Sequence, residues 1–182
     1  ANSLEERRFL ALVVPPISAA QAEARLVARF PVDVLSLDQL LIRHMKRVFF
    51  EKAKDWSVVL RADRTPAPER GASQDWRRLL GVVEKALPGL RQEISGAPRP
   101  VLLTNPGLLA RYNQMKFLDD LRDSTGRQDG PPGLWLLVVG DEQQARPMVD
   151  DKPLPVITAA QWAHIPPVWL RAEEPIAKAG KA

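Results

Sequence analysis

The chain contains no cysteine, and this absence excludes several kinds of chemistry at once. A disulfide framework, a thiolate zinc site and a cysteine nucleophile all need the missing sulfur. Because proteins without disulfides are typical of reducing compartments, we expect a cytoplasmic location. No apolar run approaches the roughly 20 residues that a membrane-spanning helix needs, so we expect no contact with a membrane.

Motifs for phosphate binding and catalysis are also missing. A phosphate loop needs glycine amides directly after the first apolar run, but Pro15 and Pro16 stand there and remove two amide donors. An ATPase that binds magnesium usually has acidic residues after its later strands, whereas Thr104 and Asn105 follow the run at 101–103. No serine lies in a Gly-x-Ser-x-Gly elbow. The sequence therefore predicts no catalytic residue, no metal site and no cofactor.

The charge balance is mildly basic, with 26 Lys and Arg against 22 Asp and Glu. This excess is compatible with nucleic acid or with an acidic partner, but it predicts neither. One predicted helix carries a basic stripe that could follow the phosphates of a nucleic acid. A solvated helix face explains the same stripe without any ligand. Its residues are Arg43, Lys46, Arg47 and Lys54.

Continuous apolar runs alternate with segments whose apolar residues recur every three or four positions. The runs are typical of strands buried on both faces of a sheet, and the periodic segments are typical of helices with one face on the core. The expected strands span residues 9–14, 32–35, 57–60, 100–104 and 134–139, with a short edge strand at 154–157. The expected helices span 18–30, 38–55, 73–94, 107–121 and 158–162, the third being interrupted near Pro88 and Gly89.

This alternation predicts an α/β fold with a mostly parallel sheet of about five strands and helices on both faces. The expected architecture is P-loop-NTPase-like or Rossmann-like, without the phosphate loop. We expect one α/β domain at residues 9–170, a lead at 1–8 and a flexible tail at 171–182. The first residue is not methionine and the end is polar, so we expect a piece of a longer protein.

Parallel sheets bind ligands outside the carboxyl ends of their strands, and polar side chains at the predicted strand ends are therefore candidates. The ordinary alternative is that such residues cap helices or begin solvated loops. The ligand-binding candidates are Arg61, Asp63, Asn105, Arg111 and Asp141.

Several short strings resemble the carboxy-terminal region of PglW-type serine/threonine kinases from bacterial phage-defence (Pgl/BREX) systems. They are Pro100-Val-Leu-Leu-Thr-Asn-Pro-Gly-Leu-Leu-Ala-Arg-Tyr112, Gly133-Leu-Trp-Leu-Leu-Val138, Arg146-Pro-Met-Val-Asp150, Pro155-Val-Ile-Thr158 and Gln161-Trp162. The resemblance implies a domain of a large cytoplasmic protein whose kinase domain lies upstream and uses ATP. It also implies defence-system partners, namely a DNA methyltransferase, a phosphatase-like protein and ATPases. The kinase motifs are absent from this chain, so no kinase residue is carried over.

Three functions remain open at this point. The first, which we favour, is a non-catalytic interaction or regulatory domain that contacts other domains of its own protein and defence-system proteins. The loops expected at 64–73 and 124–133 offer surface for such contacts. The second is a divergent nucleotide- or phosphate-binding domain, and the third is a nucleic-acid-binding module.

Overall fold

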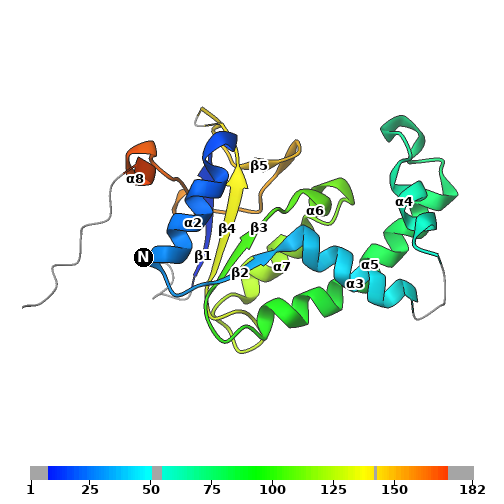
Figure 1. Cartoon of the computed structure of the whole chain (residues 1–182), viewed down its shortest axis with the longest axis horizontal. Helices are drawn as coiled ribbons and strands as arrows, with labels where there is room; N and C mark the ends of the chain where they lie inside the picture. The colour runs from blue at the N-terminus through cyan, green and yellow to red at the C-terminus, as the bar shows by residue number, and fades with distance from the viewer. Residues whose placement is uncertain (1–7, 51–54, 142, 172–182) are drawn as a thin grey trace, which may run out of the picture.

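A five-stranded parallel sheet forms the centre of the protein, with helices on both faces (Figure 1). The computed structural model describes residues 8–50, 55–141 and 143–171. The expected α/β class and parallel sheet are confirmed. The strand order is β2-β3-β4-β1-β7, and every pairing in this sheet is parallel. The strands are β1 (Phe9–Val14), β2 (Asp33–Ser36), β3 (Val101–Thr104), β4 (Leu134–Val139) and β7 (Trp162–His164).

Two separate cores explain why the central strands are apolar along their whole length. In β1, Ala11 and Val13 point into the larger core, whereas Leu12 and Val14 point into the smaller one. Such strands have no solvated face, so the alternation of apolar and polar residues is lost. The smaller core is covered by α2 (Ala19–Arg29) and α8 (Pro167–Arg171). The larger core includes residues of α3 (Leu37–Phe50), α4 (Ser57–Asp63), α5 (Gln74–Ser95), α6 (Gly107–Arg111) and α7 (Lys116–Ser124).

The long helices α3 and α5 pack against each other and extend past the sheet, where α4 joins them (Figure 1). Ser73 begins α5 as expected, because its hydroxyl oxygen accepts a hydrogen bond from the amide of Trp76 at 3.1 Å. The expected interruption of this helix is wrong, since α5 runs unbroken through Pro88. Pro88 is exposed, and its neighbours Ala86 and Leu90 are buried, so packing on both sides holds the helix together.

The strand predicted at 57–60 is also wrong, because these residues form α4. Adjacent valines favour a strand, but that preference is weak beside tertiary packing. Val59 and Ala62 are buried three positions apart, which is helical spacing, in the core shared with α3 and α5. The prediction that Arg61 and Asp63 lie at a strand end is therefore wrong as well.

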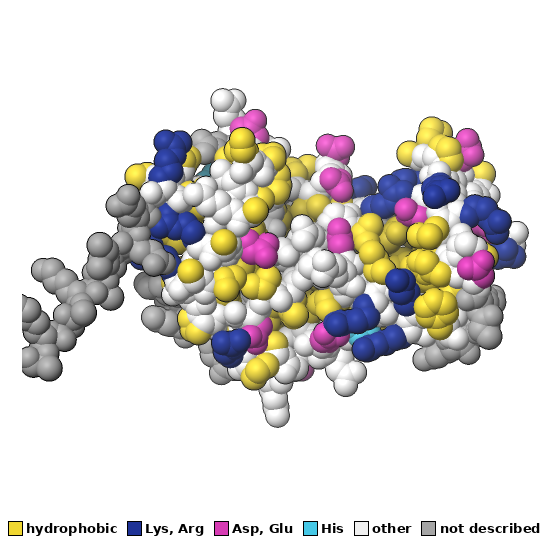
Figure 2. Space-filling model, viewed as in Figure 1, with side chains coloured by type: hydrophobic (Ala, Val, Ile, Leu, Met, Phe, Trp, Pro, Cys, Tyr) yellow, Lys and Arg dark blue, Asp and Glu magenta, His cyan; other side chains and the backbone are white. Residues whose placement is uncertain are grey.

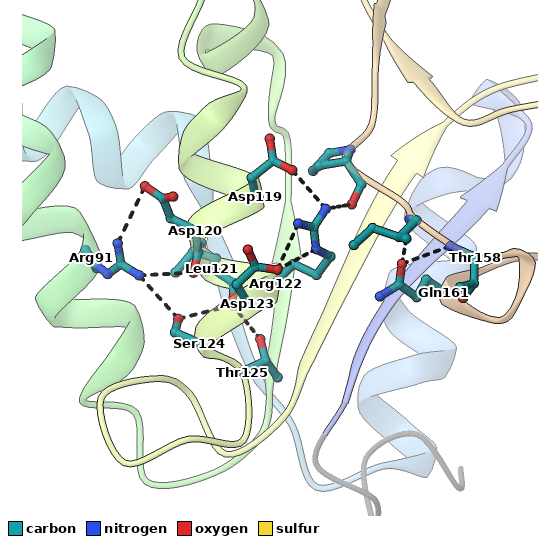
Figure 3. A network of polar contacts seen from close by, with 12 residues as sticks. Arg91, Asp119, Asp120, Leu121, Arg122, Asp123, Ser124, Thr125, Thr158 and Gln161 are labelled. Atoms are coloured by element: carbon teal, nitrogen blue, oxygen red, sulfur yellow. Dashed lines mark hydrogen bonds and ion pairs between the residues drawn. The ribbon is translucent and has the colours of Figure 1, made fainter.

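The edge strand predicted at 154–157 is wrong, and the fifth strand of the sheet is β7, which begins five residues after Ile157. Pro153 and Pro155 have no amide hydrogen to offer a neighbouring strand. Side chains hold the segment instead: Arg122 of α7 donates a hydrogen bond to the carbonyl oxygen of Pro155 (Figure 3), and Arg146 donates to that of Val156 at 3.3 Å. The brief helix expected after Thr158 is a turn of 3-10 helix at Ala159–Gln161, with the capping box closed by Gln161.

The helix expected at 107–121 is divided into α6 and α7 by Asn113, whose φ is 56°. A short hairpin of β5 (Met148–Val149) and β6 (Lys152–Pro153) follows the sheet's fourth strand. Its two turn residues, Asp150 and Asp151, have φ values of 44° and 62°, as a type I′ turn requires. The lead and tail expected at the two ends lie almost wholly outside the described residues.

Candidate functional site

A cleft of about 480 Å³ opens at the carboxyl edge of the sheet, where parallel sheets bind ligands. Its walls come from the start of α2, the turn after β3, the end of β4 and the β5–β6 hairpin. Among the lining residues Glu23 and Asp150 are charged, and both are acidic. The lining residues are Ala19, Ala20, Glu23, Thr104, Asn105, Pro106, Gly107, Leu137, Val138, Val139, Met148, Val149 and Asp150.

The turn after β1 cannot form a cradle of backbone amides. Pro15 and Pro16 lack an amide hydrogen, and the amide of Ser18 donates to the carbonyl oxygen of Pro15 at 2.9 Å. A second hollow, of about 490 Å³, lies here and is lined by Pro15, Pro16, Gly140, Asp141 and Gln143. The backbone of this turn therefore lacks the run of free amide donors with which a phosphate loop binds its ligand.

Asn105 lies in the cleft with a φ of 51°, in the left-handed region that asparagine tolerates better than most residues. Its side-chain amide donates to the hydroxyl oxygens of Ser36 and Thr104, each at 3.3 Å. The backbone carbonyl oxygen of Asn105 accepts a hydrogen bond from the backbone amide of Asp38 at 3.1 Å. Asn105 thus ties the end of β3 to the start of α3 and shapes one wall of the cleft.

Two carboxylates flank the same turn. Oδ1 of Asp38 accepts a hydrogen bond from the amide of Leu108 at 2.8 Å. A Cβ atom on Gly107 would lie 3.6 Å from Oδ2 of Asp38 and 3.6 Å from Oδ2 of Asp150. Burial raises the pKa of Asp38; the Leu108 amide opposes this, and the charge of Asp150 raises the pKa further. Because Glu23 and Asp150 are the charged residues of its described lining, the cleft is negative there, which is unfavourable for a phosphate.

Sequence reasoning did not single out Asp150. A signal was present, since Asp150 and Asp151 stand between two short extended segments, and acidic residues are common in hairpin turns. The hairpin is too short to be recognised from periodicity, and its position over the cleft depends on the fold.

Asp63 and Arg111 meet at the junction of α4 and α6. Nε of Arg111 lies 2.8 Å from Oδ1 of Asp63, and its Nη2 donates to the carbonyl oxygen of Asp63 at 2.6 Å. The hydroxyl of Tyr112 donates to the same carboxylate at 3.1 Å. Burial, followed by the charge of Asp63, raises the pKa of Tyr112 well above its usual range. These contacts satisfy the groups within the protein and brace two helices.

The five ligand-binding candidates therefore fall in separate places. Asp63 and Arg111 form the pair just described, and Arg61 is exposed on α4. Asn105 lines the cleft, whereas Asp141 lines the hollow beside Pro15. The structure does not bring the five together, and ligand binding by any of them stays a prediction.

The basic candidates of α3 share its outward side. Arg43, Lys46 and Arg47 line an open hollow of about 620 Å³ together with Gln39, Ile42 and Phe50. Lys54 lies outside the described residues. Figure 2 shows hydrophobic side chains exposed among lysine and arginine over the part of the molecule where α3 and α4 lie. The basic stripe predicted on this helix therefore also contains exposed apolar side chains, Ile42 and Phe50.

Within residues 8–50, 55–141 and 143–171, no three His, Asp or Glu side chains are grouped so that they could hold a metal ion. None of the helices in these ranges combines the length and the hydropathy of a membrane span.

Comparison with known proteins gives one informative match. A stretch of 119 residues is 32% identical to the probable kinase PglW of Streptomyces coelicolor. This chain is related to a part of PglW. The match covers 63% of the chain but spans 8% of the length of PglW. No family model matches the chain, and no solved structure does. The predicted relationship to PglW is thus confirmed, and a position in its carboxy-terminal region stays a prediction.

Proposed function

We propose that the chain is a non-catalytic interaction domain within a larger, kinase-like protein of a phage-defence system, placed in that protein's carboxy-terminal region. The observation that carries the proposal is the chemistry of the carboxyl edge. An α/β domain that handles nucleotides needs amide donors and cations there. This edge offers two prolines and the acidic residues Glu23 and Asp150.

The charges of the cleft also disfavour a nucleotide. A nucleotide triphosphate brings several negative charges, and two like charges at 4 Å repel by about 4 kcal/mol near a protein surface. The described lining of the cleft contains no lysine or arginine to offset that repulsion. Arg111, the candidate cation nearest in sequence, is already paired with Asp63. The cleft therefore suits an apolar or basic group better than a phosphate.

The relationship to PglW supports the larger setting. PglW is named as a probable kinase, and the matched segment is a small part of it. The described residues of this small domain contain no recognisable catalytic site. This supports a role in positioning or regulating the other domains of the larger protein. Its proposed partners are other domains of the same protein and other proteins of the defence system.

A divergent nucleotide-binding domain is the alternative, and the position of the cleft favours it. The cleft lies at the carboxyl ends of β3 and β4, where nucleotides bind in related architectures. A nucleotide would have to bring its own cations, such as magnesium. This alternative rests on fold-level analogy.

A phosphotransfer assay tests the proposal. The isolated chain is incubated with radiolabelled ATP and magnesium, in parallel with Streptomyces PglW and with a PglW variant that lacks the matched segment. We expect no label on the isolated chain and autophosphorylation in both forms of PglW. We also expect the separately expressed segment of PglW to bind the shortened protein. Label on the isolated chain, or no binding between the separately expressed segment and the shortened protein, would contradict the proposal.

A further inference from the structure

The outward side of α3 is unusual for a solvated helix face. Phe50 is 53% exposed and Ile42 is 37% exposed, and both lie in the same hollow as Lys46 and Arg47. Isolated exposed apolar residues are normal, but a contiguous set rimmed by cations marks interaction surfaces. We call this surface the α3 groove: Gln39, Ile42, Arg43, Lys46, Arg47 and Phe50.

The aromatic end of the groove packs against two neighbouring rings. The Phe50 ring lies 6.3 Å from those of Phe49 and Trp56, and the Phe49 ring lies 5.7 Å from that of Trp56. Phe49 is buried, so the cluster is anchored in the core. A side chain that already contacts neighbouring rings loses less conformational freedom on binding than an isolated one, and aromatic and arginine side chains are enriched among the residues that dominate the energetics of interfaces. Phe50 is therefore suited to act as a binding anchor.

Two of the three cations of the groove have no ion pair among the described residues. Arg43 pairs with Glu93, which also contacts His44 at 2.9 Å. Lys46 lies 5.6 Å from the centre of the Trp56 ring, and neither it nor Arg47 has a carboxylate partner among the described residues. The described lining of the groove contains no acidic side chain. The missing counter-charge points to an acidic partner.

From these contacts we infer that the α3 groove binds an acidic amphipathic helix of a partner protein. The apolar face of that helix lies on Ile42 and Phe50, and its carboxylates pair with Lys46 and Arg47. The groove follows α3 from Gln39 to Phe50, a length of roughly 17 Å, which matches about three turns of a bound helix. The inference rests on the proposed role as an interaction domain and names the kind of partner.

Nucleic acid is the competing occupant, and the composition of the groove disfavours it. Phosphate binding gains from many cations, typically six or more in a specific complex. The described part of the groove has three, of which Arg43 is already paired. Ile42 and Phe50 would then face a charged backbone rather than an apolar surface.

A titration followed by amide chemical shifts tests the inference. The probe is a helical peptide of about 15 residues with leucine at every third or fourth position and glutamate elsewhere. A peptide with lysine in place of glutamate is the control, and (dT)15 is the competing probe. We expect shifts confined to residues 39–50 and their neighbours, an affinity that falls with salt, and no binding of the lysine peptide.

Variants of the chain then separate the possible outcomes. Arg47→Glu and Phe50→Ala should each weaken binding of the acidic peptide by about tenfold or more. Lys85→Glu, a charge reversal on exposed α5, should leave it unchanged. Three results would overturn the inference: no binding of the acidic peptide, tighter binding of (dT)15 at the same residues, or a Phe50-dependent dimer in sedimentation. The phosphotransfer assay tests the interaction role separately, so either idea can fail alone.

Discussion

A Cβ atom on Gly89 of α5 would lie 2.6 Å from Nδ1 of His44 in α3, closer than such atoms approach in proteins. His44 is buried, and its Nε2 is held by Glu93 at 2.9 Å, so its ring has little room to move. Burial alone would raise the pKa of Glu93, but hydrogen bonds with His44 and Arg43 outweigh it and lower the pKa. The close approach of the two long helices therefore depends on this glycine.

The first prediction concerns Gly89→Ala. The new methyl group should overpack the contact and lower the free energy of unfolding by about 1–3 kcal/mol, measured by urea denaturation. Gly81 lies in the same helix with nothing within 4 Å of its Cβ position. Gly81→Ala should therefore raise the free energy of unfolding by about 0.5–1 kcal/mol through helix propensity. Equal stabilisation by both changes would show that α3 and α5 do not pack in this way.

The second prediction concerns the junction of α4 and α6. Asp63→Ala removes the acceptor for Arg111 and Tyr112, so it should cost about 1–2 kcal/mol in thermal or urea unfolding. Asp120→Asn is the matched control, because its pair with Arg91 is longer, at 3.7 Å, and more exposed. That change should cost less than about 0.5 kcal/mol. Comparable losses at the two sites would mean that the Asp63 contacts add nothing beyond a surface ion pair.

The third prediction concerns the pH dependence of Asp38. Its pKa in the folded protein is raised, so folding favours the protonated form. The stabilising contribution of this group is complete below its unfolded pKa of about 3.9 and is lost as the pH rises through the folded pKa. Asp38→Asn, which can still accept the Leu108 amide, should therefore stabilise the protein at pH 7 but not at about pH 3.

Unfolding curves across this pH range measure the effect. Asp38→Ala serves as the comparison, since it also removes the charge but leaves the Leu108 amide without its acceptor. It should be less stable than Asp38→Asn at every pH. A pH-independent difference between Asp38→Asn and the parent protein would contradict the account of the acidic cleft.

The fourth prediction concerns the arginine that holds the segment before β7. The side chain of Arg122 is 9% exposed and contacts Asp119, Asp123 and the carbonyl oxygen of Pro155 (Figure 3). Arg122→Ala should cost about 2–3 kcal/mol and speed hydrogen exchange in β7. Arg146→Ala, which removes one longer hydrogen bond from an exposed side chain, should cost less than about 1 kcal/mol. Unchanged exchange in β7 after Arg122→Ala would rule out this anchoring role.

The parts of the fold that could be predicted are those whose signals are local. β1, β3 and β4 are buried on both faces, and a run without polar residues records that burial directly. Residues 57–60 were predicted as a strand because adjacent valines favour one. They form a helix because Val59 and Ala62, three positions apart, are buried beside α5. β7 was missed because three residues carry too little pattern to detect.

Some residues of the candidate site could likewise be predicted from local sequence, whereas others could not. Asn105 could be nominated because it follows an apolar run, and strand ends meet at one edge of a parallel sheet. The pairing of Asp63 with Arg111 joins residues 48 positions apart, and no local pattern encodes it. The apolar part of the α3 groove was missed for another reason. The outward face of this helix was described by its basic residues, although Ile42 and Phe50 stand outside the periodic apolar set that includes Phe49.

The central claim is that the carboxyl edge of the sheet does not hold a nucleotide. The most direct measurement is thermal unfolding of the chain with about 1 mM ATP and magnesium. We predict a midpoint unchanged within about 1 °C, because the edge offers prolines and carboxylates to a phosphate. A nucleotide present at 100 times its dissociation constant would stabilise the fold by about 2.7 kcal/mol and raise the midpoint by about 5–11 °C. A rise of that size, lost in Asn105→Gly, would contradict the claim and make the cleft a nucleotide site.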